Sequence, residues 1–168
     1  MARGQKIPVV SEKKVSFQGY FNIKDTYKFI KDYLEDTRHY GVAEKDLDEK
    51  SLDGSRKITS KNDATAQYND YYAINIRYIL DMSGKEVDIE VGGKKKKFVN
   101  GTANLTVNAY VIPDYLEKRD VGAIGEFLGK IYDKFLGKSE LTECQEKAAE
   151  DVSGLLTEFK KNMNSKLK

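Results

Sequence analysis

The chain has 168 residues, of which 39% are hydrophobic and 33% are charged. This length is typical of one domain with a core of its own, so we expect a single domain over residues 1–168. The 29 basic and 27 acidic residues leave a net charge of +2, whereas a dedicated nucleic-acid-binding protein has a pronounced basic surplus. Any binding of an anionic partner must therefore depend on a local cluster of basic residues.

Cys144 is the only cysteine and His39 the only histidine, which excludes an internal disulfide and a zinc site built from cysteine and histidine. The N-terminal residues lack the apolar stretch of a signal peptide, and no window approaches the roughly 18 apolar residues of a membrane helix. We therefore expect no membrane partner, and a location in the cytoplasm or within an assembled particle.

The N-terminal part predicts an extended segment followed by a helix. Residues 1–14 are polar and are interpreted as an arm, and residues 14–21 alternate apolar and polar side chains, which predicts a strand. From Ile23 the apolar residues recur at helical spacing. Asn22 or Asp25 can cap this helix, and Gly41 can end it.

The next segment carries few apolar residues. Residues 42–55 are highly charged and are interpreted as an exposed loop with a short helical turn. Residues 56–60 are interpreted as a short strand that ends at the turn residues 61–63.

The central block has the clearest periodicity. Even positions from Tyr72 to Met82 are apolar, and odd positions from Ala103 to Val111 are small or apolar, as in strands with one buried face. The residues between these segments alternate as well. Three dipeptides are candidates for two-residue hairpin turns: Ser83-Gly84, Gly92-Gly93 and Asn100-Gly101. Together these features predict a four-stranded antiparallel meander.

Two amphipathic helices are predicted after Pro113, one over about residues 120–136 and one from about Ser139. The apolar residues of the second recur at spacings of three and four: Leu141, Cys144, Ala148, Val152, Leu155, Leu156, Phe159 and Met163. Residues 160–168 form a basic tail. The expected fold class is therefore α+β, with an N-terminal helix, a four-stranded antiparallel β-meander and two C-terminal amphipathic helices packed on one face.

Four consecutive lysines, Lys94 to Lys97, follow the Gly92-Gly93 turn. With two-residue turns, Lys97 lies opposite Asp88 and Lys95 lies opposite Glu90. Such cross-strand pairs neutralise much of the local positive charge.

Lys94 and Lys96 instead interrupt the apolar face of the predicted sheet, where a buried lysine without a partner is costly. Three interpretations stay open. The lysines extend past the rim of the helix-covered face, an acidic or phosphate-bearing partner covers them, or the loop through Gly92 is longer than two residues.

No Gly-rich phosphate loop, HExxH motif, nucleophile elbow or dinucleotide fingerprint occurs. We therefore expect no enzyme, no catalytic residue, no metal and no cofactor. His39 is interpreted as a residue at the C-terminal end of the first helix, and Cys144 as a small core residue. Neighbouring carboxylates such as Glu35-Asp36 or Asp46-Asp48-Glu49 could bind a metal, but a solvated charged loop is the simpler interpretation.

The chain has eleven tyrosines, and several of them cluster near two strand ends. Tyr68 and Tyr71 precede the long central strand, and Tyr110 and Tyr115 lie near the end of the last one. Exposed tyrosines favour protein interfaces, so these four residues are interface candidates. The alternative is a small satellite core under the first helix.

Several segments carry a resemblance: YKFIKDYLEDTRHYGVAEKDL, DYYAINIRYIL, GKEVDIEV, GTANLTVNAYVIPDYLEKRD and IYDKFL. They are similar to a set of small uncharacterised α+β proteins encoded in archaeal genomes, especially those of reduced-genome lineages. The resemblance spans roughly residues 20–136. It implies the fold outline and no activity.

We therefore expect a non-enzymatic structural or interaction protein that self-associates or joins a larger assembly, such as a virus-like particle or a filament. One alternative is a binding module for RNA or an acidic partner, through Lys94, Lys96 and the tail lysines Lys160 and Lys161. Another alternative is a carrier that holds an apolar ligand between the sheet and the last helix.

Overall fold

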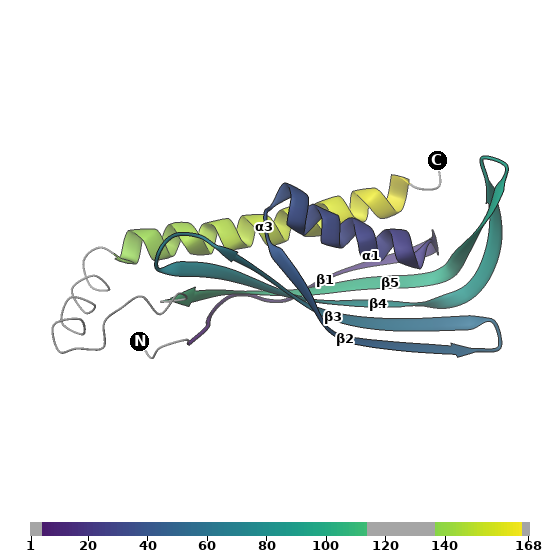
Figure 1. Ribbon diagram of the computed structural model, residues 1–168, viewed down its shortest axis with the longest axis horizontal. Helices are drawn as coiled ribbons and strands as arrows, with labels where there is room; N and C mark the ends of the chain where they lie inside the picture. Colours follow the sequence, from purple (N-terminus) through teal and green to yellow (C-terminus); the bar gives the residue numbers. More distant parts are fainter. Residues whose placement is uncertain (1–4, 114–136, 166–168) are drawn as a thin grey trace.

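The structure is a computed structural model that describes residues 5–113 and 137–165, and its architecture is one antiparallel sheet with helices on one face (Figure 1). The sheet has five strands in the order β1-β5-β4-β3-β2. The strands are β1 (Ile7–Phe21), β2 (Gly41–Leu52), β3 (Ser55–Gln67), β4 (Tyr72–Val91) and β5 (Lys94–Pro113). The helical elements are α1 (Ile23–Asp32), the π-helical turn η1 (Tyr33–Thr37) that continues it, and α3 (Gly137–Ser165).

The predicted fold class, a four-stranded meander with two C-terminal helices, is wrong. The sheet has five strands, and the described residues contain one C-terminal helix besides the short helix near the N-terminus. The helix predicted over about residues 120–136 lies outside the described residues. Residues 7–14 of the predicted N-terminal arm belong to β1, and residues 160–165 of the predicted tail belong to α3.

The segment predicted as a charged loop is the hairpin of β2 and β3. Asp53 and Gly54 form its two-residue turn, with φ angles of 50° and 76° in the left-handed region that tight hairpins use. Every residue of β2 except Val42 is exposed, so no apolar alternation marks it as a strand. The strand predicted over 56–60 and the turn predicted at 61–63 both lie within the longer β3.

One of the three turns predicted in the central block is confirmed and two are wrong. Gly92-Gly93 connects β4 to β5, with φ angles of 59° and 79°. β4 runs through Ser83-Gly84 and β5 runs through Asn100-Gly101, and Gly84 pairs with Gly101 in one uninterrupted ladder. The two strands, of 20 residues each, therefore form a single long hairpin.

Gly19, Gly101 and Gly84 lie side by side in β1, β5 and β4. A Cβ at Gly84 would overlap the Asn100 carbonyl oxygen, and a Cβ at Gly101 would overlap the Ser83 carbonyl oxygen. Only glycine permits two backbones to approach so closely. Beyond this row the hairpin bends away from the rest of the sheet (Figure 1). We refer to residues 85–100 as the arm and to the remaining described residues as the body.

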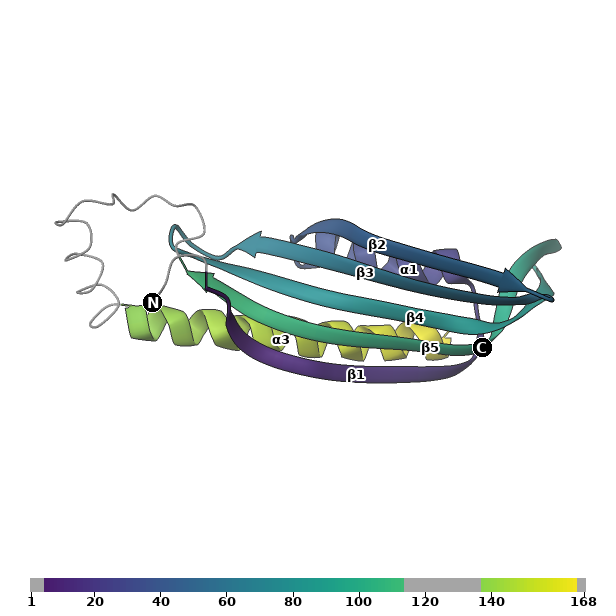
Figure 2. The same ribbon diagram turned by 90° about the horizontal axis from the view of Figure 1, so that it is seen from below.

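The core of the body lies between α3 and the sheet. α3 packs along β1, β5 and β4, and Figure 2 shows the sheet from the side opposite the helices. The predicted apolar stripe of α3 is buried; the residues that are at most 1% exposed are Cys144, Ala148, Val152, Leu155, Phe159 and Met163. Burial raises the pKa of the Cys144 thiol to about 11, as is typical of an inert core cysteine.

The N-terminal helix begins as predicted. The Asn22 side chain accepts a hydrogen bond from the Asp25 backbone N–H at 2.9 Å, which satisfies one free donor of the first turn. The helix ends in η1, after which His39 adopts a left-handed φ of 61°. The Tyr40 N–H then donates to the Leu34 carbonyl at 2.8 Å and directs the chain into β2.

Candidate interaction site at the hairpin arm

The arm continues β4 and β5, but its apolar residues lie on the other face. In the body, the even positions of β4 are buried under the helices. Because the β4–β5 ladder has no bulge, Val87, Ile89 and Val91 point to the opposite side. Lys96 pairs with Ile89 and Lys94 pairs with Val91. One face of the arm therefore combines aliphatic side chains with two lysines.

The predicted register of the lysine run is confirmed, since Lys97 lies opposite Asp88 and Lys95 lies opposite Glu90. The interpretation with a longer loop is therefore wrong. Neither of these two cross-strand pairs forms an ion pair among the described residues. All four lysines are exposed, and Val91 is 46% exposed. The tip of the arm projects past the described ends of α1 and α3 (Figure 1), so Lys94 and Lys96 lie beyond the rim of the core.

The base of the arm is fixed to the body. Phe98 and Val99 are buried, and the Asn22 side-chain amide donates to the Lys97 carbonyl at 2.9 Å. The Glu86 N–H donates to the Gly54 carbonyl at 2.8 Å and connects the arm to the β2–β3 turn. The arm is therefore a positioned element and not a loosely attached loop.

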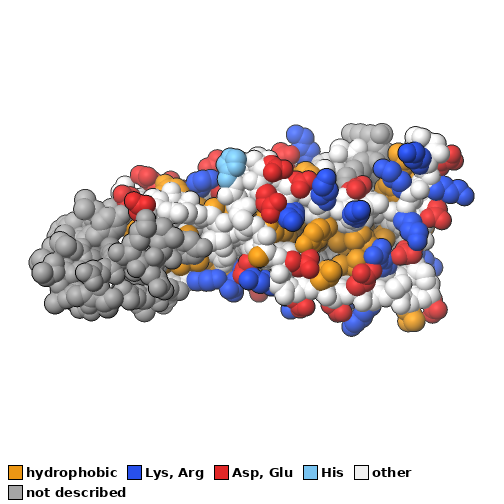
Figure 3. All heavy atoms as spheres, viewed as in Figure 1, with side chains coloured by type: hydrophobic (Ala, Val, Ile, Leu, Met, Phe, Trp, Pro, Cys, Tyr) orange, Lys and Arg blue, Asp and Glu red, His pale blue; other side chains and the backbone are white. Residues whose placement is uncertain are grey.

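The structure brings the two groups of predicted lysines to one end of the molecule. Lys160 and Lys161 are exposed near the C-terminal end of α3, and this end of α3 lies on the arm side (Figure 1). Figure 3 shows several lysine and arginine side chains at the same end.

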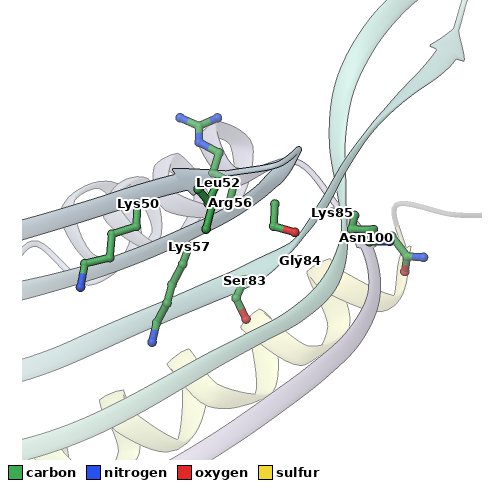
Figure 4. A pocket seen from close by; sticks show the side chains of 9 residues that line it. Lys50, Leu52, Arg56, Lys57, Ser83, Gly84, Lys85 and Asn100 are labelled. Atoms are coloured by element: carbon green, nitrogen blue, oxygen red, sulfur yellow. The ribbon is translucent and has the colours of Figure 1, made fainter.

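A pocket of about 360 Å³ lies at the base of the arm (Figure 4). It lies where the β2–β3 turn meets the bend in β4. It is lined by Lys50, Leu52, Ser55, Arg56, Lys57, Ser83, Gly84, Lys85 and Asn100. Four of these nine residues are cationic and none is acidic.

The sheet register explains this composition. Lys50 pairs with Lys57, and Lys57 pairs with Ser83, so three strands place these side chains in one row. Lys85 pairs with Ser55 on one side and with Asn100 on the other. None of the pocket residues was predicted. The Asp53-Gly54 dipeptide is a hairpin signal that could have placed Lys50 opposite Lys57.

The cations of the pocket differ in their partners. The Arg56 Nε donates to Glu49 at 2.7 Å, and an Arg56 Nη lies 3.8 Å from Glu86. The Lys50 amine lies 3.8 Å from Asp48. Lys57 and Lys85 form no ion pair with any other residue that the structure describes.

The edge strand β2 has the opposite character to the arm. It carries the carboxylates of Glu44, Asp46, Asp48 and Glu49 beside two lysines. Leu47 is 51% exposed and Leu52 is 75% exposed. Asp46 and Asp48 have only long ion pairs, at 3.9 Å to Lys61 and 3.8 Å to Lys50. The register places Leu52, Asp46 and Asp48 on one face of β2 and Leu47 on the other, so the edge offers one exposed leucine beside weakly paired carboxylates.

The predicted interface tyrosines lie at the other end of the sheet, where Tyr72 pairs with Pro113. Tyr68 and Tyr71 are half-buried and pack against the core. Tyr110 is half-buried, and its ring lies 5.6 Å from the Lys6 amine and 5.7 Å from the Arg77 guanidinium. Tyr115 lies outside the described residues. The described tyrosines thus contribute more to packing than to an open surface.

A buried polar cluster connects α3 to the end of η1. Asp151 is fully buried and accepts hydrogen bonds from Tyr40 Oη at 2.7 Å, Arg38 Nη1 at 3.2 Å and Lys147 Nζ at 3.0 Å. Burial raises the pKa of Tyr40, and its hydrogen bond to Asp151 adds to the effect. The cluster pairs every charge that it buries, which is what a structural contact requires.

A second polar group lies between α1 and the sheet. Tyr27 Oη donates to Glu44 at 2.7 Å, and burial together with this carboxylate raises the pKa of Tyr27 to about 12. The Tyr78 hydroxyl is buried and has no hydrogen-bond partner among the described residues. Across the described ranges, no group of three or more His, Cys, Asp or Glu side chains is placed to hold a metal ion.

Comparison with protein-family models, with curated proteins and with solved structures finds no match to this chain. The resemblance to small archaeal α+β proteins therefore stays a prediction. Within residues 5–113 and 137–165, no helix has both the length and the apolar character needed to cross a membrane.

Proposed function

We propose that this protein is a non-enzymatic interaction protein that self-associates, with the arm of one copy docking on the β2 edge of the next. The observation that carries the proposal is the arm itself. Its tip displays aliphatic side chains and lysines beyond the helix-covered core, where they contribute little to the stability of the monomer. An isolated two-stranded hairpin is marginal in water, so a long uncovered one suggests a covering partner.

The chemistry of β2 supports a second copy as that partner. The arm combines Val91 with exposed lysines, whereas one face of β2 combines Leu52 with the carboxylates of Asp46 and Asp48. Apolar contact and opposite charge are thus complementary between two different surfaces of the same chain. A contact between different surfaces is head-to-tail, and it produces a ring when the rotation closes or a filament when it does not.

Strand addition is a less favourable route to assembly. β2 carries charged side chains and a bulge between Glu44 and Asp46, and β1 carries Pro8 and two irregularities near its start. These features protect sheet edges from pairing with another chain. The contact is therefore expected to use side chains of the arm and of β2.

The test is size-exclusion chromatography with light scattering over a wide range of protein concentration and salt. We expect a mass above the monomer value of 19.1 kDa at high concentration and low salt, and a fall in mass as salt is added. Val91→Glu should keep the protein monomeric, because it places a carboxylate in the apolar contact. Ala149→Glu adds the same charge at an exposed position of α3 and should leave the mass unchanged. A wild-type chain that stays at 19.1 kDa under all these conditions would rule out self-association.

A second candidate function is binding of RNA or an acidic partner. It is supported by the exposure of Lys94, Lys96, Lys160 and Lys161 at one end of the molecule. Fluorescence anisotropy with single-stranded RNA would then give an affinity that falls steeply with salt. The double change Lys94→Glu and Lys96→Glu should weaken it and reduce the salt dependence. An affinity that these changes leave intact would exclude the arm as the binding element.

The third hypothesis, a carrier of an apolar ligand, has less support. Such a carrier needs space between the sheet and the last helix, and the described apolar residues of α3 are packed directly on the sheet there.

A further inference from the structure

We infer that the pocket at the base of the arm binds a phosphate dianion, either as free phosphate or as a terminal phosphomonoester. This site adjoins the contact proposed between arm and edge strand: Leu52 belongs to the edge strand, and Lys85 and Asn100 belong to the base of the arm, whereas the proposed contact uses the tip of the arm. Its volume of about 360 Å³ is at the small end of the range for ligand pockets and suits a compact group better than an extended chain.

Two lysines of the pocket have no ion-pair partner among the described residues. Lys57 and Lys85 come from β3 and β4, and neither forms an ion pair with the other described residues. Lys50 adds a third amine with only a long contact to Asp48. Like charges in one pocket repel each other, and an anion with two negative charges would relieve that repulsion. Lysine amines are common point-charge ligands of phosphate.

The side chains of Lys50, Lys57 and Ser83 lie on the same face of the sheet. Lys50 pairs with Lys57 and Lys57 with Ser83, and in a strand the side chains of such partners share one face of the sheet. In Figure 4 the side chains of Lys50, Lys57 and Ser83 point to one side of the sheet, whereas the Arg56 guanidinium points to the other. Arg56 is held there by Glu49, and the Lys50 amine lies 3.8 Å from Asp48 on the face of the amines. Lys57 and Lys85 are therefore the amines of the pocket that have no carboxylate partner among the described residues.

The pocket also contains uncharged side chains that can donate hydrogen bonds. The hydroxyls of Ser55 and Ser83 and the amide of Asn100 line the same pocket. Phosphate has several oxygens that each accept hydrogen bonds, so it can use these donors together with the amines.

The test is a titration of the uniformly ¹⁵N-labelled full chain with inorganic phosphate, followed by amide chemical shifts, with chloride held at matched ionic strength. We expect saturable shifts at Ser83, Gly84 and Lys85. The double change Lys57→Ala and Lys85→Ala should weaken binding about ten-fold or more, which is equivalent to about 1.4 kcal/mol. Lys61→Ala is the matched control, because Lys61 lies on the same strand and face but outside the pocket.

Two further probes identify the source of the phosphate. Glycerol phosphate carries a terminal monoester, and a single-stranded oligonucleotide without terminal phosphate carries only diesters. Binding of phosphate alone or of phosphate and the monoester supports the proposal. Equal shifts with chloride, equal binding by the double variant, or preference for the diester would overturn it.

The pocket test and the self-association test change different side chains, so their results can be separated. The double pocket variant should keep the light-scattering mass of the wild type, and Val91→Glu should keep the affinity for phosphate. The failure of one proposal can therefore be told from the failure of the other.

Discussion

The body and the arm are made from the same two strands, yet they differ in what lies over them. In the body, every second side chain of β4 and β5 is buried under α3, and Leu80, Leu105 and Val107 are fully buried. In the arm the ladder continues in the same register, but the lysines are exposed and Val91 is 46% exposed. Backbone pairing alone therefore does not decide whether a strand builds a core or a projecting surface.

The border between the two regions is the row of Gly19, Gly101 and Gly84. At this row the sheet bends, and the apolar phase of β4 changes from even to odd positions. The change moves the apolar side chains of the arm to the face that no helix covers. The comparison teaches that a shift of hydrophobic phase within a continuous strand can mark the end of a core and the start of an interaction surface.

The body and the arm should differ most in the free energy of unfolding that is lost when one apolar side chain is shortened in each region. Leu105→Ala in the body should lower the free energy of unfolding by about 2–5 kcal/mol, because it leaves a cavity under α3. Val91→Ala in the arm should change it by no more than about 0.5 kcal/mol. Urea denaturation followed by circular dichroism measures both. Similar losses from the two variants would mean that the arm is part of the core.

The second prediction concerns the border. Gly101→Ala should lower the free energy of unfolding by about 2–3 kcal/mol, because the new Cβ overlaps the Ser83 carbonyl oxygen and forces the strands apart. Gly41→Ala is the control, since its Cβ would lie 3.7 Å from the nearest atom, the Thr65 carbonyl oxygen. If Gly101→Ala is as stable as Gly41→Ala in the same denaturation experiment, the close approach at the bend is not present.

The third prediction compares two buried tyrosine hydroxyls of the body, one with a hydrogen-bond partner and one without. Tyr40→Phe removes a hydrogen bond to the buried Asp151 and should cost about 1.5–3 kcal/mol. Tyr78→Phe removes a hydroxyl that has no partner among the described residues, so it should be neutral or stabilising, by up to about 1 kcal/mol. The two variants are isosteric, which makes thermal unfolding a direct comparison. A loss at Tyr78 as large as the loss at Tyr40 would show that the Tyr78 hydroxyl is bonded.

The sequence predicts the buried strands and the buried helix face better than the exposed edge strand and the bend, for a physical reason. Regular burial leaves a period of two in β4 and β5 and spacings of three and four in α3, and the apolar stripe of α3 and the Gly92-Gly93 turn are confirmed. The phase change near Ser83-Gly84 has the same appearance in the sequence as a hairpin turn, so the bend was interpreted as two turns. β2 is exposed on both faces, so its sequence shows no alternation of apolar and polar residues.

The candidate sites could likewise be predicted only where the signal is local in the sequence. Lys94 and Lys96 were identified because their position relative to the Gly92-Gly93 turn fixes their partners, and that local register is confirmed. The pocket residues Lys50, Lys57 and Lys85 come from β2, β3 and β4, and the boundaries predicted from the sequence differ from those of these strands. A site formed by register across β2, β3 and β4 has no local signal. Tyr68, Tyr71 and Tyr110 lie at one end, as expected for an interface, but they are half-buried there.

The central claim, that the arm of one copy docks on the β2 edge of another, is tested most directly by exchanging charges and mixing. One variant carries Lys94→Glu and Lys96→Glu in the arm, and the other carries Asp46→Lys and Asp48→Lys in the edge. Each variant alone should stay at 19.1 kDa, because arm and edge then repel. An equal mixture should assemble, since each arm then meets an edge of opposite charge. A mixture that stays at the monomer mass in light scattering, or single variants that assemble like the wild type, would contradict the account.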